Sequence, residues 1–394
     1  MKIIEIVSIW PCEIFIQRHI DSFVSKEVKP KLVSLGMIYK KPTSSIQPTN
    51  KKIDLIPQFD NLNLFGKIKS LRYLWNNPKL LLSSEGWQNK LIRNYFINEQ
   101  PDLIHFHWSN TAVRMSWMMV ELQIPFTFSL RGHDITELTT SPDYVNKLLA
   151  TIKLAAGVHS VSEELWEQTK KICANNLDYI FHKTIYTTVP KSTNNLNSSK
   201  LSNHRKTTFI TVARLDWSKN LVSLILAFYK YLEFGNDAIL MIIGDGDQRI
   251  KASLNFWINY LLIADNVLLL GTVESDRVFE ILRESDGYIQ SSISEGFSNA
   301  VAEAMTLGMP VFATNAGGTE EIIIDGINGF ILEVKEPENW WKKLSLINNK
   351  QLMRMIGDQA LKDSIQFSPE NHANNFLKFY EESIKFARKK NLNN

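Results

Sequence analysis

The sequence predicts an α/β protein made of two doubly wound domains, which in the simplest arrangement face each other across a cleft. Its 394 residues are more than one hydrophobic core normally serves. Apolar strand-like segments alternate with segments of helical period in both halves, a pattern typical of parallel strands with helices on both faces. One polar stretch at 191–206, rich in Asn and Ser, lacks an apolar period and indicates a linker.

In the first half, strand-like apolar runs alternate with segments of helical period. The expected strands are 2–9, 32–38, 102–108, 126–130, 157–161 and 184–189. The expected helices are 14–25, 87–98, 111–122 and 163–174. This alternation predicts an N-terminal Rossmann-like domain over residues 1–195.

The second half repeats the pattern after the linker. The expected strands are 209–213, 238–243, 266–270, 287–290, 311–314 and 329–332. The expected helices are 221–234, 250–263, 276–283, 299–307 and 319–324, followed by 338–348, 351–365 and 369–389 with no strand between them. We therefore expect a second Rossmann-like domain over 205–368 and a C-terminal helix at 369–394 that packs back towards the N-terminal domain.

Composition indicates an ordinary globular protein and argues against several other classes. Hydrophobic residues make up 44% and charged residues 22%, and the net charge of +3 gives no reason to expect a nucleic-acid partner. Cys12 and Cys173 lie far apart without metal-ligand spacing, which suggests reduced thiols in a cytoplasmic protein. No stretch approaches the ~20 apolar residues of a membrane span. Glu5 interrupts the N-terminal apolar run, which we interpret as a strand rather than a signal peptide.

The stretch at 291–305 carries the clearest chemical signal. It follows an apolar strand end, and Ser298 is a good N-cap for the helix that begins at Asn299. Glu295 lies on the loop and Glu303 inside the helix, so carboxylates flank a helix N-terminus that can bind an anion. A nucleotide-sugar fits such a site, because it has phosphates in its middle and hydroxyl groups at both ends. The alternative is that both acids are solvated charges placed there by the helix dipole.

Other loops after expected strands carry weaker signals. Arg214 and Lys219 follow the first strand of the second half, where two cations would bind a diphosphate, although both are also ordinary surface charges. The glycines of Gly244-Asp-Gly246 and of Gly317-Gly318 would let the backbone approach a ligand, or would serve only tight turns.

Two loops of the first half point to the same edge of their sheet. His105 and His107 share one face of a strand, and two histidines are too few for a metal site, so packing or hydrogen bonding is expected of them. Arg131 and His133 follow the next strand, where they would contact a phosphate or an acceptor hydroxyl; otherwise they belong to a loop stabilised by Asp134.

In their order and spacing, these motifs resemble glycosyltransferase family 4, a group of retaining transferases with the two-domain GT-B fold. The resemblance is strong over about 205–335. The residues that carry it are Val212-Ala-Arg214, Lys219, Gly244-Asp-Gly246, Gly271, Glu295 with Glu303 eight positions later, Pro310-Val311, Gly317-Gly318, Glu321, Asp325 and Asn328-Gly329-Phe330.

The resemblance implies a role for each matched residue. Glu303 would bind the ribose hydroxyls, Glu295 the donor sugar, and Arg214 with Lys219 the diphosphate, whose developing charge they would stabilise. The resemblance further implies donor binding by Gly244, Gly246, Gly271, Val273, Gly296, Phe297, Ser298 and Asn299. We expect Glu295, Arg214, Lys219 and His133 to be catalytic and Arg131 and His107 to lie on the acceptor side.

The first half departs from the family pattern. The residues after the first strand read Trp10-Pro-Cys-Glu-Ile-Phe-Ile16, which only some members resemble. The family's His-Gly pair appears as Arg131-Gly132, with His133 just beyond, so either residue is a candidate for the family's cleft histidine.

The implied activity is transfer of a sugar from a UDP- or GDP-sugar to a hydroxyl of a saccharide or lipid-linked saccharide. Retention of configuration, no metal and no cofactor beyond the co-substrate, and a part in cell-surface polysaccharide synthesis also follow from the resemblance. The alternatives are a nucleotide-sugar-binding protein without turnover, and an epimerase or phosphorylase of the same fold.

A peripheral membrane contact is a further expectation. The first 90 residues carry 14 Lys and Arg against 7 Asp and Glu, a balance of +7 (14 − 7). The stretch 64–75 places apolar residues on one helical stripe beside basic ones, as in a helix that lies on an anionic bilayer at the inner face of the membrane. The same stripe would also suit a core helix.

Overall fold

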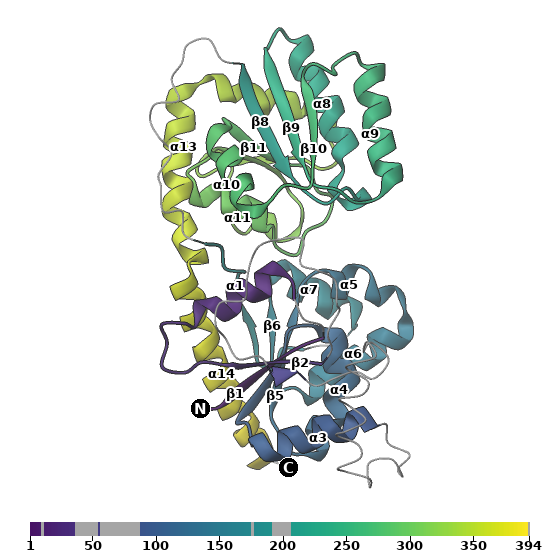
Figure 1. The fold of residues 1–394 in the computed structure, drawn as a ribbon, viewed down its shortest axis with the longest axis vertical. Helices are drawn as coiled ribbons and strands as arrows, with labels where there is room; N and C mark the ends of the chain where they lie inside the picture. Colours follow the sequence, from purple (N-terminus) through teal and green to yellow (C-terminus); the bar gives the residue numbers. More distant parts are fainter. Residues whose placement is uncertain (9–11, 36–53, 56–86, 175–176, 191–205, 393–394) are drawn as a thin grey trace. The chain divides into compact units, whose positions relative to one another are not determined.

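A computed structural model describes residues 1–8, 12–35, 54–55, 87–174, 177–190 and 206–392 of the chain (Figure 1). The chain divides into two compact units. Unit 1 comprises Met1–Val161, Leu165–Tyr186 and His372–Asn394, and unit 2 comprises Ser162–Glu164 and Thr187–Asn371. The stripe expected at 64–75, nearly all of the linker expected at 191–206 and part of the loop at 10–16 lie outside the described residues.

Unit 1 is built on a seven-stranded parallel sheet in the order β3-β2-β1-β4-β5-β6-β7. The strands are β1 (Ile3–Val7), β2 (Lys31–Ser34), β3 (Asp54–Leu55), β4 (Leu103–Phe106), β5 (Phe126–Leu130), β6 (Gly157–Ser160) and β7 (His182–Thr184). The helices are α1 (Ile14–Ser22), α3 (Trp87–Glu99), α4 (Ser109–Glu121), α5 (His133–Thr136), α6 (Pro142–Leu154), α7 (Glu163–Ile172) and α14 (Pro369–Leu392).

The strand order of unit 1 reverses between β1 and β4. From β1 the chain moves to β2 on one side, and from β4 it moves through β5 and β6 to the other. Loops diverge at the carboxyl ends of strands where the order reverses, and ligands of doubly wound sheets bind there. His107 follows β4 and Arg131 follows β5 at this edge.

The long helix α14 supplies part of the core of unit 1. Its residues Phe376, Phe379 and Tyr380 are buried against Ile3 of β1 and Phe23. The apolar spacing of these aromatic residues places them on one face of the helix, which explains why the helix packs on the sheet.

Unit 2 is built on a six-stranded parallel sheet in the order β10-β9-β8-β11-β12-β13. The strands are β8 (Thr207–Val212), β9 (Ala238–Ile243), β10 (Val267–Gly271), β11 (Gly287–Gln290), β12 (Val311–Thr314) and β13 (Phe330–Leu332). The longer helices are α8 (Leu221–Glu233), α9 (Gln248–Tyr260), α10 (Ser275–Glu284), α11 (Asn299–Thr306), α12 (Trp340–Leu344) and α13 (Lys350–Asp363).

The strand order of unit 2 reverses between β8 and β11, which pair in parallel. Helices α8 and α9 lie on one side of β8, β9 and β10, and α10 and α11 lie on the other (Figure 1). Right-handed crossovers require this arrangement, because the direction of the chain across the sheet changes after β10. The core combines buried residues from the sheet with residues from α8, α9, α12 and α13, among them Phe209, Phe228, Leu254 and Trp340.

The strands agree closely with the sequence expectation. The bounds of β5, β9, β11 and β12 are those predicted, because each is an apolar run that ends at a polar residue, Gly or Pro. The segment 184–189 was wrong as a strand: β7 ends at Thr184, and the N–H of Val189 donates to the carbonyl of Phe367.

The helix expected at 319–324 is also absent from the structure. Only a single 3₁₀ turn, Gly317–Thr319, forms there. The side chain of Asn328 accepts a hydrogen bond from the N–H of Ile324 at 2.7 Å and donates to the carbonyl of Ile322 at 3.0 Å. These bonds satisfy the backbone groups that a helix would have paired.

Helix α6 was not predicted, although its start carries a recognisable signal. Ser141 caps the helix by accepting a hydrogen bond from the N–H of Tyr144, and Pro142 occupies the first turn. Ser, Pro and Asp in succession are typical of a helix N-terminus.

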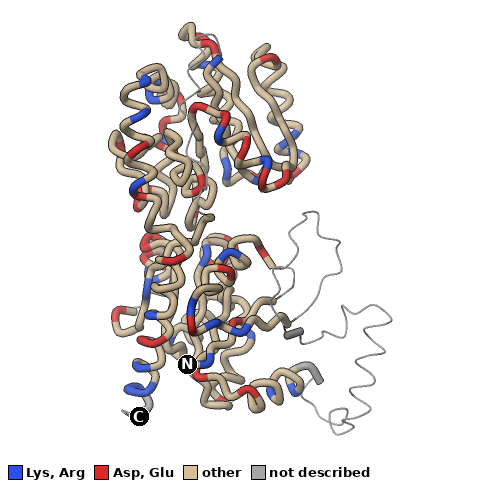
Figure 2. Tube along the Cα trace, turned by 60° about the vertical axis from the view of Figure 1, so that its left-hand side comes forward, with Lys and Arg blue, Asp and Glu red and all other residues tan. Residues whose placement is uncertain are grey.

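Charges of both signs are interspersed along the trace of each unit (Figure 2). Within the described residues, no helix combines the length and hydrophobicity that crossing a bilayer requires.

We predict that Gly357→Ala destabilises unit 2, although alanine normally stabilises a helix relative to glycine. A Cβ atom at Gly357 in α13 would lie 2.2 Å from the carbonyl oxygen of Gly308, a backbone atom that cannot rotate away. We expect a loss of about 1–3 kcal/mol in the free energy of unfolding, measured by urea denaturation. Asp358→Ala at the next, exposed position is the control and should leave stability nearly unchanged. A Gly357→Ala variant as stable as this control would contradict the close packing of α13 against Gly308.

Candidate active site

A cavity of about 210 Å³ opens in unit 2 at the point where the strand order reverses. It is bounded by the end of β8, the end of β11 and the start of α11. The lining residues are Thr211, Val212, Ala213, Arg214, Lys219, Tyr288, Gln290, Ser291, Ser292, Glu295, Phe297, Ser298, Asn299 and Ala300. A cavity at such a position is the expected ligand site of a doubly wound domain.

The strongest interaction in the cavity joins Lys219 to Glu295. Lys219 Nζ lies 2.6 Å from Glu295 Oε1, and the two side chains are only 17% and 14% exposed. The hydroxyl of Ser292 donates to the same carboxylate oxygen at 2.7 Å. Glu295 is therefore fixed by one charged and one neutral donor before any ligand binds.

Residues after β11 connect the two loops that carry this pair. The hydroxyl of Ser291 donates to the carbonyl of Lys219 at 2.7 Å, and the N–H of Ile293 donates to the carbonyl of Ser218 at 2.7 Å. The hydroxyl of Thr314 donates to the carbonyl of Ser292 at 2.6 Å. These bonds involve rigid backbone groups, so the distance between Lys219 and Glu295 is set by the fold rather than by the ion pair alone.

Two glycines allow the Glu295 loop to take this position. A Cβ atom at Gly317, which has φ +54°, would lie 1.9 Å from the carbonyl oxygen of Glu295. At Gly318 a Cβ atom would lie 2.4 Å from the carbonyl oxygen of Gly296. Only glycine permits this approach of two backbone segments.

The Gly244-Asp-Gly246 motif has a similar part beneath the Arg214 loop. A Cβ atom at Gly244 would lie 1.8 Å from the carbonyl oxygen of Ala213, and one at Gly246 would lie 2.6 Å from that of Leu215. The N–H of Gly244 also donates to the carbonyl of Gly271 at 2.8 Å. The structure thus gives these glycines a packing role, and ligand binding by them stays a prediction.

The first turn of α11 faces the cavity with its polar groups. Ser298 caps the helix through its hydroxyl, which accepts a hydrogen bond from the N–H of Val301 at 3.4 Å. Asn299 Oδ1 is buried and has no hydrogen-bond partner among the residues that the structure describes. A buried acceptor without a donor is unfavourable, so a donor group of a ligand or of water would lower the free energy of this site.

Glu303 lies inside α11 and is only 9% exposed. It does not line the cavity, but its charge reaches Tyr288 on the cavity floor. Burial, together with the charges of Glu295 and Glu303, raises the pKa of Tyr288 well above its ordinary value. Tyr288 therefore stays a neutral hydroxyl, which donates to the carbonyl of Val212 at 3.4 Å.

The cavity brings together six of the predicted site residues: Arg214, Lys219, Glu295, Phe297, Ser298 and Asn299. Arg214 is the most exposed, at 79%, and lies 3.2 Å from Asp216. Gly244, Gly246, Gly271, Val273, Gly296 and Glu303 do not line the cavity, and their contact with a donor stays a prediction.

Sequence reasoning missed several polar residues that do line it. Gln290 is buried at the carboxyl end of β11, and Ser292 is buried just after it. Tyr288 is buried two residues before Gln290 in the same strand. The available signal was a run of polar residues at the end of an otherwise apolar strand.

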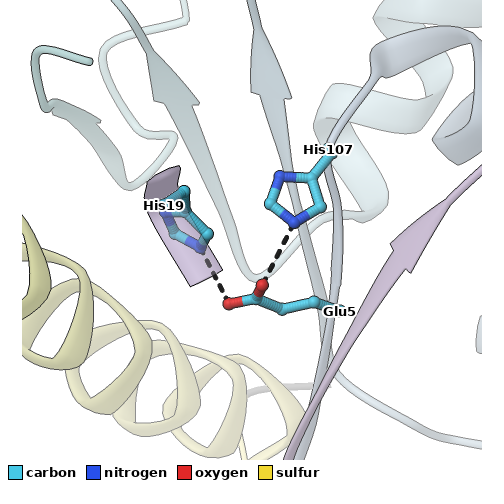
Figure 3. Close-up of side chains that lie close together, drawn as sticks. All are labelled: Glu5, His19 and His107. Atoms are coloured by element: carbon cyan, nitrogen blue, oxygen red, sulfur yellow. Dashed lines mark hydrogen bonds and ion pairs between the residues drawn. The ribbon is translucent and has the colours of Figure 1, made fainter. Parts of the chain in front are cut away.

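In unit 1 the predicted residue His107 belongs to a buried polar cluster around Glu5 (Figure 3). Glu5 Oε1 lies 2.9 Å from His19 Nε2, and Glu5 Oε2 lies 3.1 Å from His107 Nε2. The hydroxyl of Tyr380 donates to Glu5 Oε1 at 2.9 Å. Because His107 is 0% exposed, its side chain contacts these neighbours rather than a ligand.

The hydrogen bonds around Glu5 determine where the protons lie. His372 Nδ1 donates to the carbonyl of Tyr186 at 2.9 Å, so its Nε2 accepts from His19 Nδ1 at 2.8 Å. Burial raises the pKa of Glu5, but the charge of His19 and hydrogen bonds from both histidines outweigh it and hold that pKa well below its usual range. His19 therefore donates from Nδ1 to His372, and its Nε2 faces the Glu5 carboxylate.

The neighbours of His107 also determine which of its nitrogens carries the proton. Arg131 Nη2 can only donate, and it lies 3.3 Å from His107 Nδ1. His107 therefore carries its proton on Nε2 and is neutral, since burial lowers its pKa to about 4.

Glu5, His19 and His107 are the group of metal-ligand types that lies close together in the described part of the chain. They do not fit a metal ion. A metal on His107 Nε2 would require a proton on Nδ1, which would then face the donor Arg131 Nη2. The atoms that would bind a metal are already joined to one another by the hydrogen bonds drawn in Figure 3.

The other predicted residues of unit 1 lie nearer the surface. Arg131 Nε donates to the carbonyl of His107 at 2.9 Å, and its guanidinium lies over the ring of Phe15 at 4.8 Å. The side chain of His133 is 48% exposed and pairs with Glu137 at 3.3 Å. A catalytic role for His133 stays a prediction.

Comparison with known sequences adds an independent line of evidence. Residues 192–363 match the family model of glycosyl transferases group 1. An uncharacterized glycosyltransferase of Methanocaldococcus jannaschii is 28% identical over 297 residues, which cover 74% of this chain and 79% of that protein. The N-acetyl-alpha-D-glucosaminyl L-malate synthase of Bacillus anthracis is 26% identical over 303 residues, covering 73% and 76%.

Solved structures are similar over nearly the whole chain. The Anabaena protein HepE in complex with UDP matches with a TM-score of 0.72 at 16% identity, covering 96% of this chain and 99% of that one. A glycosyltransferase from Rickettsia africae matches with a TM-score of 0.71 at 18% identity, covering 98% of both. At such identities the likeness shows the fold, and the two-domain α/β fold of the GT-B type expected from the sequence is confirmed.

We predict that the buried histidines make the protein less stable in acid. Burial is the main cause that lowers the pKa of His105, His107, His159 and His372 in the folded chain. Between the unfolded pKa of about 6.5 and the lower folded value, the unfolded state binds more protons, so stability falls as pH falls. For His107 this window reaches down to about 4. For His107 the loss between pH 6.5 and 5 is on the order of 2 kcal/mol.

Urea unfolding midpoints at pH 7.5, 6.0 and 5.0 measure this slope. The variant His159→Gln should show a shallower slope than the wild type, whereas the exposed-site control His133→Gln should keep it. A midpoint that does not change from pH 7.5 to 5.0 would contradict the neutral assignment of these rings.

Proposed function

We propose that the chain is a group 1 glycosyltransferase, because residues 192–363 match that family model, and that it transfers a sugar from a UDP- or GDP-sugar to a hydroxyl of a saccharide or lipid-linked saccharide. The observation that carries this proposal is the cavity of unit 2. There Lys219, Glu295 and the N-terminal turn of α11 meet at the reversal point of the sheet. The structural relative HepE binds UDP and UDP-glucose, which supports a nucleotide-sugar donor for this chain as well.

In this proposal the diphosphate lies against the first turn of α11. The free N–H groups there and the helix dipole favour an anion, and Ser298 and Asn299 line the same turn. Lys219 and Arg214 supply positive charge from the loop after β8. Glu295 accepts hydrogen bonds from hydroxyls of the sugar, and Glu303 from those of the ribose.

Charge balance explains how such a site would favour the transition state. In the free enzyme the charge of Lys219 is offset by Glu295. A diphosphate leaving group gains negative charge as the glycosidic bond breaks, so Lys219 is attracted more strongly to it in the transition state than in the ground state. The sugar hydroxyls then replace Lys219 as donors to Glu295.

We also propose retention of the anomeric configuration without a metal ion. The acceptor hydroxyl attacks the anomeric carbon on the face that the diphosphate leaves, and a phosphate oxygen takes its proton. One C–O bond forms as the other breaks, and the nucleoside diphosphate departs with the bond's electron pair. Lys219, Arg214 and the N–H groups of α11 supply the positive charge of this step.

The wider setting follows from the resemblance alone. We propose synthesis of a cell-surface polysaccharide in the cytoplasm, with peripheral contact to the inner face of the membrane. The stretch 64–75 that suggested this contact lies outside the described residues. Co-sedimentation with anionic liposomes at low salt tests the contact.

We predict that Glu303→Ala and Glu295→Ala separate binding from turnover. Glu303→Ala should lose the stabilisation that UDP gives the wild type, which is roughly 2.7 kcal/mol at 100 times the dissociation constant. Glu295→Ala should keep UDP binding and lose turnover at least about 100-fold. Thermal shift and donor hydrolysis measure the two effects, and Glu280→Ala on the exposed face of α10 is the control. Unchanged binding and turnover in both variants would reject the assignment, as would a wild type that binds UDP-sugars but never releases free sugar.

We predict that Ser292→Ala lowers kcat about five- to tenfold with little change in KM for the donor. The variant removes the neutral donor to Glu295 Oε1 but leaves Lys219 in place. Ser253→Ala in α9, away from the cavity, is the matched control. Equal kcat in both variants would mean that Ser292 does not position Glu295.

The stereochemical proposal predicts a product with the anomeric configuration of the donor. Proton NMR of the product formed in the first minutes measures it through the anomeric coupling constant. An inverted product rejects retention, and loss of activity in EDTA that added Mg²⁺ restores rejects metal independence.

A further inference from the structure

The guanidinium of Arg131 lies at the carboxyl edge of the unit 1 sheet. Arg131 follows β5, and its neighbour β4 adjoins β1, where the strand order reverses. This is the position at which doubly wound sheets bind ligands. It is in the opposite half of the chain from the cavity of unit 2.

Arg131 is held in one orientation by His107 and Phe15. Its Nε donates to the carbonyl of His107 at 2.9 Å, and its Nη2 donates to His107 Nδ1 at 3.3 Å. The ring of Phe15 lies 4.8 Å from its Cζ. His107 is itself fixed by Glu5 (Figure 3). Such bracing reduces the entropy that the arginine would lose on binding a ligand.

No carboxylate of the described residues lies within 4.0 Å of this guanidinium. Glu5 is occupied by His19, His107 and Tyr380. Asp134 accepts from the N–H of Arg131 at 2.7 Å and from Ser109, both of them uncharged donors. Within the described part of the chain, the charge of the arginine side chain is thus not matched by an ion pair.

The third nitrogen of the guanidinium, Nη1, is available to a ligand. Nη1 makes no hydrogen bond within the described residues, and Arg131 as a whole is partly exposed. Burial lowers the pKa of Arg131 to about 10, and the side chain therefore stays charged at neutral pH. The charges of Asp134 and Glu13 act on it as well, but Glu13 is exposed and makes no ion pair with it.

We propose that Arg131 binds a carboxylate or phosphate group of the acceptor, so that the acceptor of this enzyme is an anion. The inference rests on the proposed function for the existence of an acceptor. This guanidinium is oriented, partly desolvated and without a carboxylate partner among the described residues. An oxyanion would accept hydrogen bonds from its N–H groups and balance its charge. A neutral saccharide hydroxyl would leave that charge unbalanced.

Thermal-shift titration of the full chain tests the proposal. The protein is saturated with UDP to fill the cavity of unit 2, and L-malate, glycerol 3-phosphate or neutral glycerol is then added. The wild type and Arg114→Gln, an exposed arginine of α4, should be stabilised by at least one of the two anions and not by glycerol. Arg131→Gln should bind that anion at least about tenfold more weakly, because it loses a charged hydrogen bond.

A second arm distinguishes a soluble acid from a lipid phosphate. Vesicles of phosphatidylcholine with phosphatidic acid replace the small anions, and binding is measured by co-sedimentation. Binding to these vesicles that Arg131→Gln loses and Arg114→Gln keeps supports a lipid phosphate. Arg131→Lys keeps the positive charge but lacks the planar guanidinium group, so it should bind with intermediate affinity. This variant replaces Arg131→Gln in the test if Arg131→Gln does not fold.

The proposal is overturned if Arg131→Gln binds the anions as the wild type does. It is also overturned if neither the small anions nor the vesicles bind the wild type. The UDP shift is recorded first, before any anion is added, and its absence would contradict the proposed function rather than the role of Arg131.

Discussion

The ion pair between Lys219 and Glu295 joins the two loops that line the cavity of unit 2. Its atoms lie 2.6 Å apart, and both side chains are largely withdrawn from water. Withdrawing two charges is costly, and the attraction between them offsets the cost only when the geometry is good and other hydrogen bonds assist. Ser292 provides such a bond to Glu295, and Ser291 fixes the backbone of Lys219. The glycines at 317 and 318 allow the loop of Glu295 to come close enough.

The two units handle buried charge in different ways. Unit 1 encloses the Glu5–His19 pair completely, and Glu5 accepts further hydrogen bonds from His107 and Tyr380, so this pair serves the fold. Unit 2 places its pair at the wall of a cavity, where a ligand that carries hydroxyls and phosphates would offer competing partners to both side chains. Exchange of partners is possible only in the second arrangement, and it is what a glycosyl transfer site needs.

Much of the fold followed from local patterns, whereas much of the site depends on contacts over long range. Strands β9 and β11 are apolar runs with clear ends, and their bounds were predictable. Glu5 was interpreted only as a break in an apolar run. Its partners His19, His107 and Tyr380 lie 14, 102 and 375 positions away, so no local pattern contains them. The Ser292–Glu295 bond lies within one loop, but it requires the loop geometry set by Gly317 and Gly318.

A double-mutant cycle on Lys219→Met and Glu295→Gln, followed through kcat/KM for donor turnover, tests the central claim most directly. If the two side chains act as one unit on the leaving group and the sugar, the double variant should be about as impaired as the worse single variant. Losses that multiply across the two substitutions would show that each residue acts alone, and would contradict the coupling of Lys219 to Glu295 on which the proposed transfer site depends.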